Sequence, residues 1–459
     1  MSATSSPYLE DLRTRLEGSL VLPGDPGWDT ARTAWQLAAD QRPVAVVIAR
    51  SAADVAATID TAVASGLRLA PQGSGHGATP LGPLDDTILL RTVEMSGVHI
   101  DPVRRRATVG AGVLWAEVTA TAAEHGLTAL SGSAADVGVV GYTLGGGLSW
   151  FARSHGLAAN HVTAATVVTA DGRVLRVDAD NEPELFWALR GGGGAFAVVI
   201  ELEFALFPIT EVYAGAMFWP IEHAEAVLAR WRDWTRTVPD AVTSLGRFLR
   251  FPPVEMIPPP FRGRSLVAIE VVAQLDPQTA AELLAPLREL TPELDTVAPT
   301  PVTKLELLHM DPPGPTPGVG DGFQLTALPD EALAALLAAA GPGADLPLLS
   351  VEVRHLGGAL TPGASEGGAV SSLDAAFAVF SVGPMFDPAF APALNAAVDS
   401  VAAALAPWRA RTSYRNFTER RTDDLVFDTD VVHRRLQNVK KTYDPLDVIR
   451  AGHPIRPAG

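Results

Sequence analysis

The chain has 459 residues, of which 47% are hydrophobic and 19% charged, enough for a large folded core in two or three domains and too apolar for global disorder. A formal net charge of -17 argues against nucleic acid or an anionic membrane surface as a partner. The lack of cysteine excludes disulfides, zinc–thiolate sites and iron–sulfur clusters. The first residues show no signal-peptide pattern and no apolar run reaches ~18 residues, so we expect a cytoplasmic protein without a membrane span.

Short strands and helices alternate in the first part of the chain. Ser51 begins a helix with a capping-box pattern, and Gly66 lies where a glycine commonly follows a helix end. The strands expected here are 43–49, 67–70, 87–90 and 107–109, and the helices are 51–64 and 114–124. This alternation indicates an α+β fold.

A glycine-rich loop, Pro71 to Gly77, follows the strand at 67–70. Its three glycines allow the backbone to adopt positive φ and to approach a ligand closely. The N–H groups of such a loop can converge on one point, which suits a phosphate group. His76 lies within this loop, where a purely structural turn would not need an imidazole. The alternative is an ordinary surface turn with an incidental histidine.

A second glycine-rich segment spans residues 131–147. Its six glycines are too many for an ordinary helix or strand interior. Val137, Val139, Val140 and Leu144 are interleaved with them, which distinguishes the segment from a polar flexible linker. We therefore expect the backbone here to pass close to a large flat ligand.

A hairpin with an Asp171-Gly172 turn is expected next, and a third glycine run, 191–194, follows it. The remaining elements of this part are the hairpin strands 164–170 and 173–177, a helix at 184–189 and a half-buried strand at 196–204. The glycine run lacks the strand-to-helix context of a dinucleotide fingerprint, so a Rossmann nucleotide site is not expected.

The region from 210 to 410 changes in character. Arg354 and His355 are candidates to face a substrate pocket, although a lone histidine in a strand is more often structural. The segment 297–320, which contains His309, is rich in proline and glycine and is either a connecting loop or a loop over that pocket. The expected strands are 218–219, 265–272, 350–355 and 377–381, and the expected helices are 222–235, 279–290, 330–340 and 387–406.

Taken together, the glycine-rich motifs resemble those of the vanillyl-alcohol-oxidase type of FAD proteins and, within it, the berberine-bridge-enzyme-like oxidases. The resemblance covers about residues 40–208 and returns near the end of the chain, where Tyr414-Arg-Asn416-Phe is similar to the family's Tyr-x-Asn-Tyr segment. A helix at 425–441 precedes a second similar segment, Tyr443-Asp444-Pro445. The fold implied has three parts: a two-subdomain PCMH-type FAD-binding domain at 1–209 (PCMH part about 38–209), a substrate-binding domain with an antiparallel sheet covered by helices at 210–410, and a return to the FAD domain at 411–459.

The resemblance also implies a site. His76 corresponds to the histidine that bonds covalently to the flavin 8α-methyl group, and Tyr414 corresponds to a tyrosine that acts as catalytic base over the flavin. No metal is implied. The residues implied to contact FAD are Gln72, Gly73, Ser74, Gly75, His76, Gly77, Ala78, Gly132, Ser133, Val137, Gly138, Gly141, Tyr142, Gly147, Val199 and Asn416.

Three of the departures from the family pattern bear on the cofactor and the base. Ala134 stands where many members have a second, flavin-linked cysteine, so only one linkage, through His76, is implied, as in the bacterial 6-hydroxynicotine type. Gln72 stands where an arginine is common. Leu148 stands where several members have a second tyrosine, which leaves the base as Tyr414 or a carboxylate. The alternatives are a non-covalent flavin contact for His76 and a core aromatic for Tyr414.

The implied activity is that of an oxidase. A C–H bond next to oxygen or nitrogen in an alcohol, sugar lactol or amine delivers a hydride to flavin N5, and O₂ takes the electrons to give H₂O₂. Val137 occupies a position where the family tends to have a small residue that admits oxygen, which favours an oxidase. The alternatives are a flavin dehydrogenase with a quinone-like acceptor and a flavin-binding protein without turnover.

Overall fold

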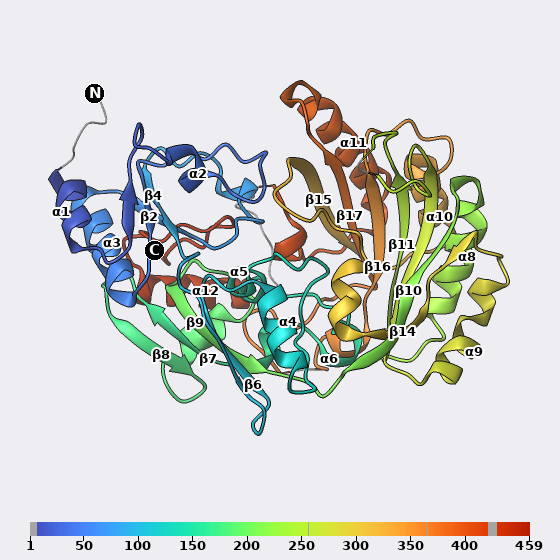
Figure 1. The fold of residues 1–459 in the computed structure, drawn as a ribbon, viewed down its shortest axis with the longest axis horizontal. Helices are drawn as coiled ribbons and strands as arrows, with labels where there is room; N and C mark the ends of the chain where they lie inside the picture. Colours follow the sequence, from blue (N-terminus) through green and yellow to red (C-terminus); the bar gives the residue numbers. More distant parts are fainter. Residues whose placement is uncertain (1–6, 256, 365, 421–428) are drawn as a thin grey trace.

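A computed structural model describes residues 7–255, 257–364, 366–420 and 429–459. Within these ranges the strands form three sheets. The two smaller sheets lie on one side of the molecule, and the largest sheet with its helices lies on the other (Figure 1). The mixture of helices and sheets, with an antiparallel sheet in the middle region, confirms the fold class predicted from the sequence.

The first sheet is mainly parallel. Its strands, in spatial order, are β1 (Ser19–Val21), β2 (Ala45–Ile48), β4 (Thr87–Arg91) and β3 (Arg68–Gln72), accompanied by helices α1 (Pro7–Arg15), α2 (Trp28–Arg32) and α3 (Ala52–Ser65). Helix α3 connects β2 to β3 and begins as predicted, because the Ser51 side chain accepts a hydrogen bond from the Asp54 N–H at 3.2 Å. Gly66 ends the helix in the left-handed conformation, with φ 67°.

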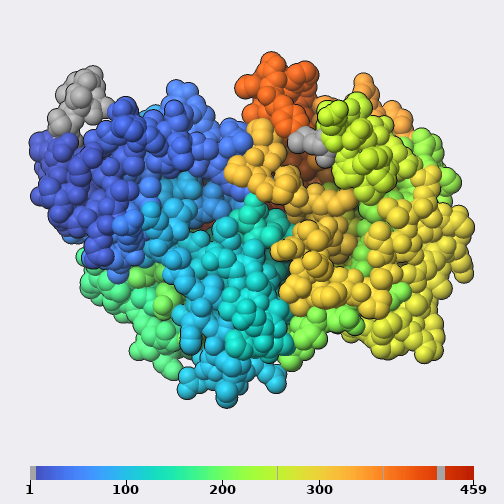
Figure 2. Space-filling view, in the orientation of Figure 1, coloured from blue at the N-terminus to red at the C-terminus, as the bar shows by residue number. Residues whose placement is uncertain are grey.

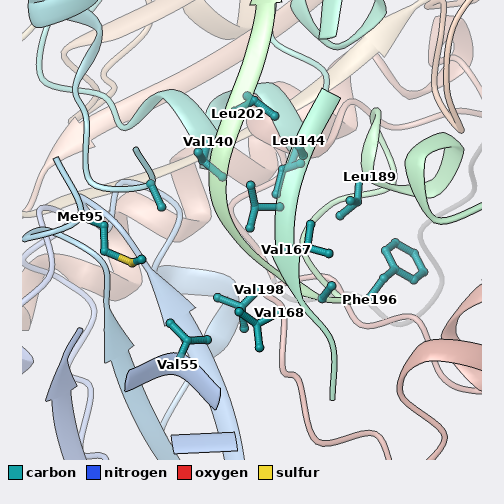
Figure 3. Packing of buried hydrophobic residues seen from close by; sticks show 14 of the residues in the cluster. Val55, Met95, Val140, Leu144, Val167, Val168, Leu189, Phe196, Val198 and Leu202 are labelled. Carbon is teal, nitrogen blue, oxygen red and sulfur yellow. The ribbon is translucent and has the colours of Figure 1, made fainter. Parts of the chain in front are cut away.

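The second sheet is antiparallel and includes the predicted hairpin as β7–β8. Its strands, in spatial order, are β5 (Val98–Asp101), β6 (Arg106–Gly110), β9 (Val198–Ala205), β7 (Val162–Val168) and β8 (Val174–Asp178), accompanied by helices α4 (Trp115–Ala123), α5 (Val139–Leu144), α6 (Ala152–His155) and α7 (Pro183–Leu189). Figure 3 shows Val140 and Leu144 of α5 packed near Leu202 of β9 in the core shared by the two smaller sheets.

Helix α5 corrects one expectation, since the segment 131–147 is not wholly irregular. The helix begins after Gly138 and ends at Gly145, so Gly141 alone is interior to it. The destabilisation that Gly141 causes inside the helix is offset because the apolar side chains around it are buried. The short helix therefore carries the glycine-rich segment along the core and leaves Gly141 exposed.

The third sheet is antiparallel and belongs to the middle region. Its strands, in spatial order, are β13 (Leu294–Asp295), β10 (Glu211–Pro220), β12 (Ser265–Ala273), β11 (Val242–Arg250), β16 (Ser350–His355), β17 (Phe377–Pro384) and β15 (Gly318–Leu325), with β14 (Ala298–Pro301) also paired to β10. Helices α8 (Ala224–Thr235), α9 (Pro277–Arg288), α10 (Asp330–Ala340) and α11 (Ala391–Ala404) pack on one side of it (Figure 1). The sequence did not predict β11 or β15.

The opposite face of the third sheet packs against the first part of the chain. Leu245 of β11 and Val272 of β12 share a buried cluster with Leu130, Trp150 and Phe151. Figure 2 shows the blue and cyan N-terminal part lying against the yellow and orange middle part. The two halves are therefore joined by an apolar contact.

The end of the chain returns to the first sheet. Helix α12 (Asp430–Tyr443) ends close to the predicted position, and residues 425–428 of the predicted helix lie outside the described residues. The fully buried Lys440 ammonium donates to the carbonyls of Ala195 and Ile449 at 2.7 and 2.9 Å. Leu69 of β3 forms backbone hydrogen bonds with Val448 and Arg450. This return segment thereby fixes β3 from its far side.

Short 3-10 helices complete the described elements: η1 (Thr79–Leu81), η2 (Ala158–His161), η3 (Ile221–His223), η4 (Val302–Leu307), η5 (Gly358–Leu360), η6 (Pro388–Phe390), η7 (Ala406–Trp408) and η8 (Arg415–Phe417). In the ranges given above, none of the helices is both long and apolar enough to cross a membrane.

Candidate functional site

A cavity of about 460 Å³ lies where the three glycine-rich segments meet β16 and the return segment. Its volume is within the range of small-molecule and cofactor sites. Of the residues predicted to form the site, those on its wall are Gln72, Gly73, Ser74, Gly75, His76, Gly77, Gly132, Ser133, Val137, Gly138, Gly141, Tyr142, Val199, Tyr414 and Asn416. Two others are not on it. Ala78 is buried behind the loop, and Gly147 packs against the ring of Tyr142, where a Cβ would lie 2.6 Å from that ring.

The loop after β3 presents backbone to the cavity. Gly75 has φ 90°, and a Cβ there would lie 2.9 Å from the Cβ of Ala34, so only glycine fits without strain. The buried Gln72 amide accepts a hydrogen bond from Gln41 through Oε1 at 2.9 Å. Its Nε2 is buried and has no hydrogen-bond partner among the described residues. That orphaned donor and the adjacent backbone suit an anionic group in the cavity.

His76 is held on three sides. Its Nδ1 lies 2.9 Å from the hydroxyl of Ser74, and its Nε2 lies 3.4 Å from a carboxylate oxygen of Asp136. Its ring stacks on Trp35, with ring centroids 3.9 Å apart and an interplanar angle of 18°. Burial lowers the pKa of His76 to about 4, against the opposing effect of Asp136, so the imidazole is neutral at physiological pH. The sequence did not indicate Trp35 or Asp136, which come from other segments.

The second and third glycine-rich segments form the adjacent walls. Gly138 donates its backbone N–H to the Ser74 hydroxyl at 3.2 Å, which ties the second segment to the first. The Tyr142 hydroxyl donates to the carbonyl of Leu130 at 3.1 Å, so that only its ring is available to a ligand. From the third segment, Gly193 and Gly194 also line the cavity. These walls are mostly backbone and apolar side chains, as expected for a flat ring system.

Tyr414 and Asn416 lie together at the remaining side. Asn416 donates to the carbonyl of Tyr142 at 2.9 Å and to the Tyr414 hydroxyl at 3.2 Å. Gly145 must remain glycine, because a Cβ there would lie 1.8 Å from the Asn416 amide oxygen. Burial raises the pKa of Tyr414 well above its usual value, and the Asn416 hydrogen bond and the Arg354 charge oppose this.

Arg354 of β16 brings a cation to the same wall. Its guanidinium lies over the rings of Trp150 and Phe417 and donates to Glu352 at 2.9 Å. Glu352 also contacts His309 Nε2 at 3.0 Å. The neighbouring His355 does not line the cavity. It pairs with Arg153 at 3.0 Å, and burial lowers its pKa to about 3, so it is structural, as its isolation in a strand suggested.

The carboxylates behind Arg354 form a buried charged chain. Glu270, which is fully buried, contacts Arg247 and His309 at 2.7 Å each. Burial and Arg247 lower the pKa of His309, but the carboxylates of Glu270, Asp311 and Glu352 outweigh them and raise it to about 9. His309 therefore carries a positive charge and is buried, within the irregular segment between η4 and β15.

A carboxyl group that the sequence did not single out also lines the cavity. Burial and the nearby Asp321 raise the pKa of Glu419 to about 7. Glu419 lines the same cavity as Tyr414. The residues that the structure describes contain no cluster of acidic or histidine side chains able to hold a metal ion.

These residues fit a bound FAD. Three stretches of close backbone, an orphaned buried amide donor at Gln72 and a neutral histidine surround one cavity of cofactor size. The apolar wall suits the ring system and the first loop suits the pyrophosphate.

Comparison with known proteins agrees with this fit. Residues 43–178 match the family model of an FAD binding domain. (R)-6-hydroxynicotine oxidase of Paenarthrobacter nicotinovorans is 35% identical over 205 residues, which are 44% of this chain and 45% of that protein. Glucooligosaccharide oxidase of Sarocladium strictum is 36% identical over 216 residues, which are 46% and 43% of the two chains. These alignments span less than half of each relative.

The likeness in fold extends much further. The solved structure of the BBE-like 1 protein of Physcomitrella patens matches with a TM-score of 0.85 at 17% identity, and covers 98% of this chain and 99% of that one. Residues 43–178 therefore form an FAD-binding domain, and the chain as a whole has the fold of the berberine-bridge-enzyme-like flavoproteins of the PCMH type.

Proposed function

We propose that the chain is an FAD-dependent oxidase of a small organic substrate, an alcohol, sugar lactol or amine, which loses a hydride from a C–H bond next to oxygen or nitrogen. The observation that carries this proposal is the Tyr414 hydroxyl on the cavity wall, flanked by Asn416 and Arg354. Bound FAD supplies the two-electron acceptor, and O₂ restores it with release of H₂O₂. The relatives' names, a 6-hydroxynicotine oxidase and a glucooligosaccharide oxidase, support these substrate classes.

Tyr414 is the proposed proton acceptor for the substrate O–H or N–H. Burial raises its pKa, so the hydroxyl must first lose its proton to solvent before it can act as base. The Asn416 amide donates to its oxygen, and the positive charge of Arg354 favours negative charge there. These two residues therefore favour the phenolate, which is the form that accepts the substrate proton. Glu419 is the second candidate for this role.

His76 is the proposed single point of covalent attachment. Its neutral imidazole supplies a nitrogen lone pair, and Ala134 leaves no cysteine for a second bond. Retention of the cofactor follows from that one bond. As part of the same proposal, residues 1–209 and 411–459 make the cofactor domain, residues 210–410 make the substrate domain, and the protein is cytoplasmic.

The test is a substrate panel with peroxide detection on the flavin-loaded protein. Amines, alcohols and reducing sugars are added in aerated buffer, and flavin bleaching and H₂O₂ are recorded together. Bleaching with stoichiometric H₂O₂ supports the oxidase. Bleaching that reverses only with a quinone dye replaces the oxidase with a dehydrogenase, and a flavin that no substrate of these classes bleaches contradicts both enzyme proposals.

A further inference from the structure

We propose that Asp136 is a positioning residue for covalent attachment of FAD. Its carboxylate holds the imidazole proton of His76 on Nε2, leaves Nδ1 as the nucleophile toward the flavin 8α-methyl carbon, and accepts the Nε2 proton as the bond forms. This inference rests on the proposed attachment through His76 and adds the residue that activates it.

The contacts around Asp136 fix both of its carboxylate oxygens. Oδ2 accepts a hydrogen bond from the Trp35 indole N–H at 2.5 Å, and Oδ1 lies 3.4 Å from His76 Nε2. The same Trp35 ring lies flat against the imidazole. Trp35 is itself anchored, because its backbone N–H donates to the carbonyl of Ser74 at 3.0 Å. The three side chains therefore form one rigid group beside the cavity.

These contacts select one tautomer of His76. An ionised carboxylate can only accept hydrogen bonds, so the nitrogen that faces Asp136 must carry the proton. Nε2 is buried and has no closer hydrogen-bond partner among the described residues, and the Asp136 carboxylate lies 3.4 Å from it. Nδ1 then has a free lone pair and accepts the hydroxyl proton of Ser74, whose oxygen in turn accepts the Gly138 N–H. The nucleophilic nitrogen is therefore Nδ1.

The environment also keeps that lone pair available. Burial holds the imidazole neutral near pH 7, because its pKa lies at about 4. The Asp136 side chain is 29% exposed, so a proton that it accepts can pass to water. A buried neutral nucleophile beside a partly solvated acceptor is the arrangement that general-base assistance needs.

The overall step balances as follows. One C–H bond of the methyl group and the Nε2–H bond are broken, and one C–N bond to Nδ1 is formed, while the remaining imidazole nitrogen becomes the acceptor. The Nε2 proton leaves through Asp136. Two protons and two electrons are removed in all: the methyl proton is lost to solvent, like the Nε2 proton, while the two electrons pass through the bound flavin to O₂, which takes up two protons from solvent to give H₂O₂. Ser74 must turn its hydroxyl away from Nδ1 as the bond forms, while it keeps the Gly138 N–H.

The experiment follows attachment directly, without turnover. The full-length protein is produced in riboflavin-starved cells, FAD is added in aerated buffer, and acid-precipitated flavin is measured over time against total bound flavin. We expect Asp136→Asn to bind FAD and to slow the appearance of acid-stable flavin by at least about 100-fold. Asp136→Glu restores most of the rate, since a carboxylate is again within reach of Nε2.

Two controls separate this role from others. Asp311→Asn removes a carboxylate that acts on His76 only through space, and it should attach FAD at nearly the wild-type rate. His76→Ala should give no acid-stable flavin. If Asp136→Asn attaches FAD at the wild-type rate while His76→Ala attaches none, the role of Asp136 is wrong and the attachment site stands. If the wild type forms no acid-stable flavin, the attachment itself is wrong.

A second readout does not depend on any variant. NMR of the flavinyl peptide from the wild-type protein identifies the linked imidazole nitrogen. Linkage through Nδ1 supports the tautomer argument, and linkage through Nε2 overturns it. Linkage through Nε2 would therefore overturn the proposal even if Asp136→Asn fails to fold.

Discussion

The two regions that face the cavity build their walls in different ways. The loops after β3, before α5 and before β9 present backbone, and glycine is required at several points, such as Gly75 and Gly145, because a Cβ would collide. The third sheet instead presents a long charged side chain, Arg354, held from behind by Glu352 and His309. A backbone wall accepts one shape of ligand, whereas a side-chain wall can be changed residue by residue without altering the fold. This contrast supports the proposal that the first region holds the cofactor and the second the substrate.

The largest effect is expected from removing His76, the reactive side chain on the wall that is otherwise built from backbone. We expect His76→Ala to lose all acid-stable flavin, because no cysteine is present to take over the bond. The flavin of the wild type should stay with acid-precipitated protein, and that of the variant should appear in the supernatant. Acid-stable flavin in the variant would show that another residue forms the bond.

A substitution where the two regions meet should slow flavin reduction but leave the flavin content of the protein unchanged. Tyr414→Phe removes the hydroxyl beside Asn416 and should slow flavin reduction by roughly 10²-fold or more. Anaerobic stopped-flow reduction measures this, and the flavin content serves as the control. A normal reduction rate would move the role to Glu419, for which Glu419→Gln is the matched variant.

The charged chain behind Arg354 should make the stability of the protein depend on pH. The pKa of His309 is raised to about 9, above its unfolded value near ~6.5, so its contribution is complete below about pH 6.5 and disappears as the pH rises through about 9. For this fully buried group the contribution is on the order of 3 kcal/mol.

His309→Gln tests this dependence. Urea denaturation midpoints of wild type and variant should differ most at pH 6 and converge toward pH 9.5. His125→Gln, on an exposed turn after α4, is the control and should show no such convergence. A difference that stays constant with pH would contradict the charged state of His309.

The smallest effect is expected at Val137, an apolar residue on the backbone wall. Val137→Leu adds bulk to that wall and should slow reoxidation of the reduced flavin by O₂ several-fold, while reduction by substrate stays nearly unchanged. Stopped-flow mixing of photoreduced protein with aerated buffer measures it. If reoxidation of the wild type by O₂ takes minutes while a quinone dye is reduced fast, the result favours a dehydrogenase over an oxidase.

The elements that could be predicted are those whose pattern is local. Ser51 and Gly66 bracket α3 as expected, and the Asp171-Gly172 turn joins β7 to β8, because caps and turns are set by a few adjacent residues. Strand β11 was missed because all its positions except the last are buried, which removes the alternation that marks a strand. Strand β15 was missed because its glycines indicate a loop.

The residues of the site also divide into those that a local sequence pattern marks and those that it does not. The glycine-rich loops and His76 could be found because their motifs are contiguous in the sequence. Asp136 and Trp35 meet His76 from separate segments, and His309 meets Glu270 and Glu352 only through the tertiary fold. No local pattern marks such pairs. Sequence reasoning found most of the cavity wall and did not find the charged chain.

The return of the chain to β3 sets the order in which the protein can mature. A ribosome completes residues 43–178 long before it makes the segment that carries Tyr414, Asn416 and the buried Lys440, yet one cavity needs them all. The return segment lines one side of that cavity and pairs with Leu69. We therefore expect a chain cut short before residue 414 to bind FAD poorly even though its matched FAD-binding sequence is whole.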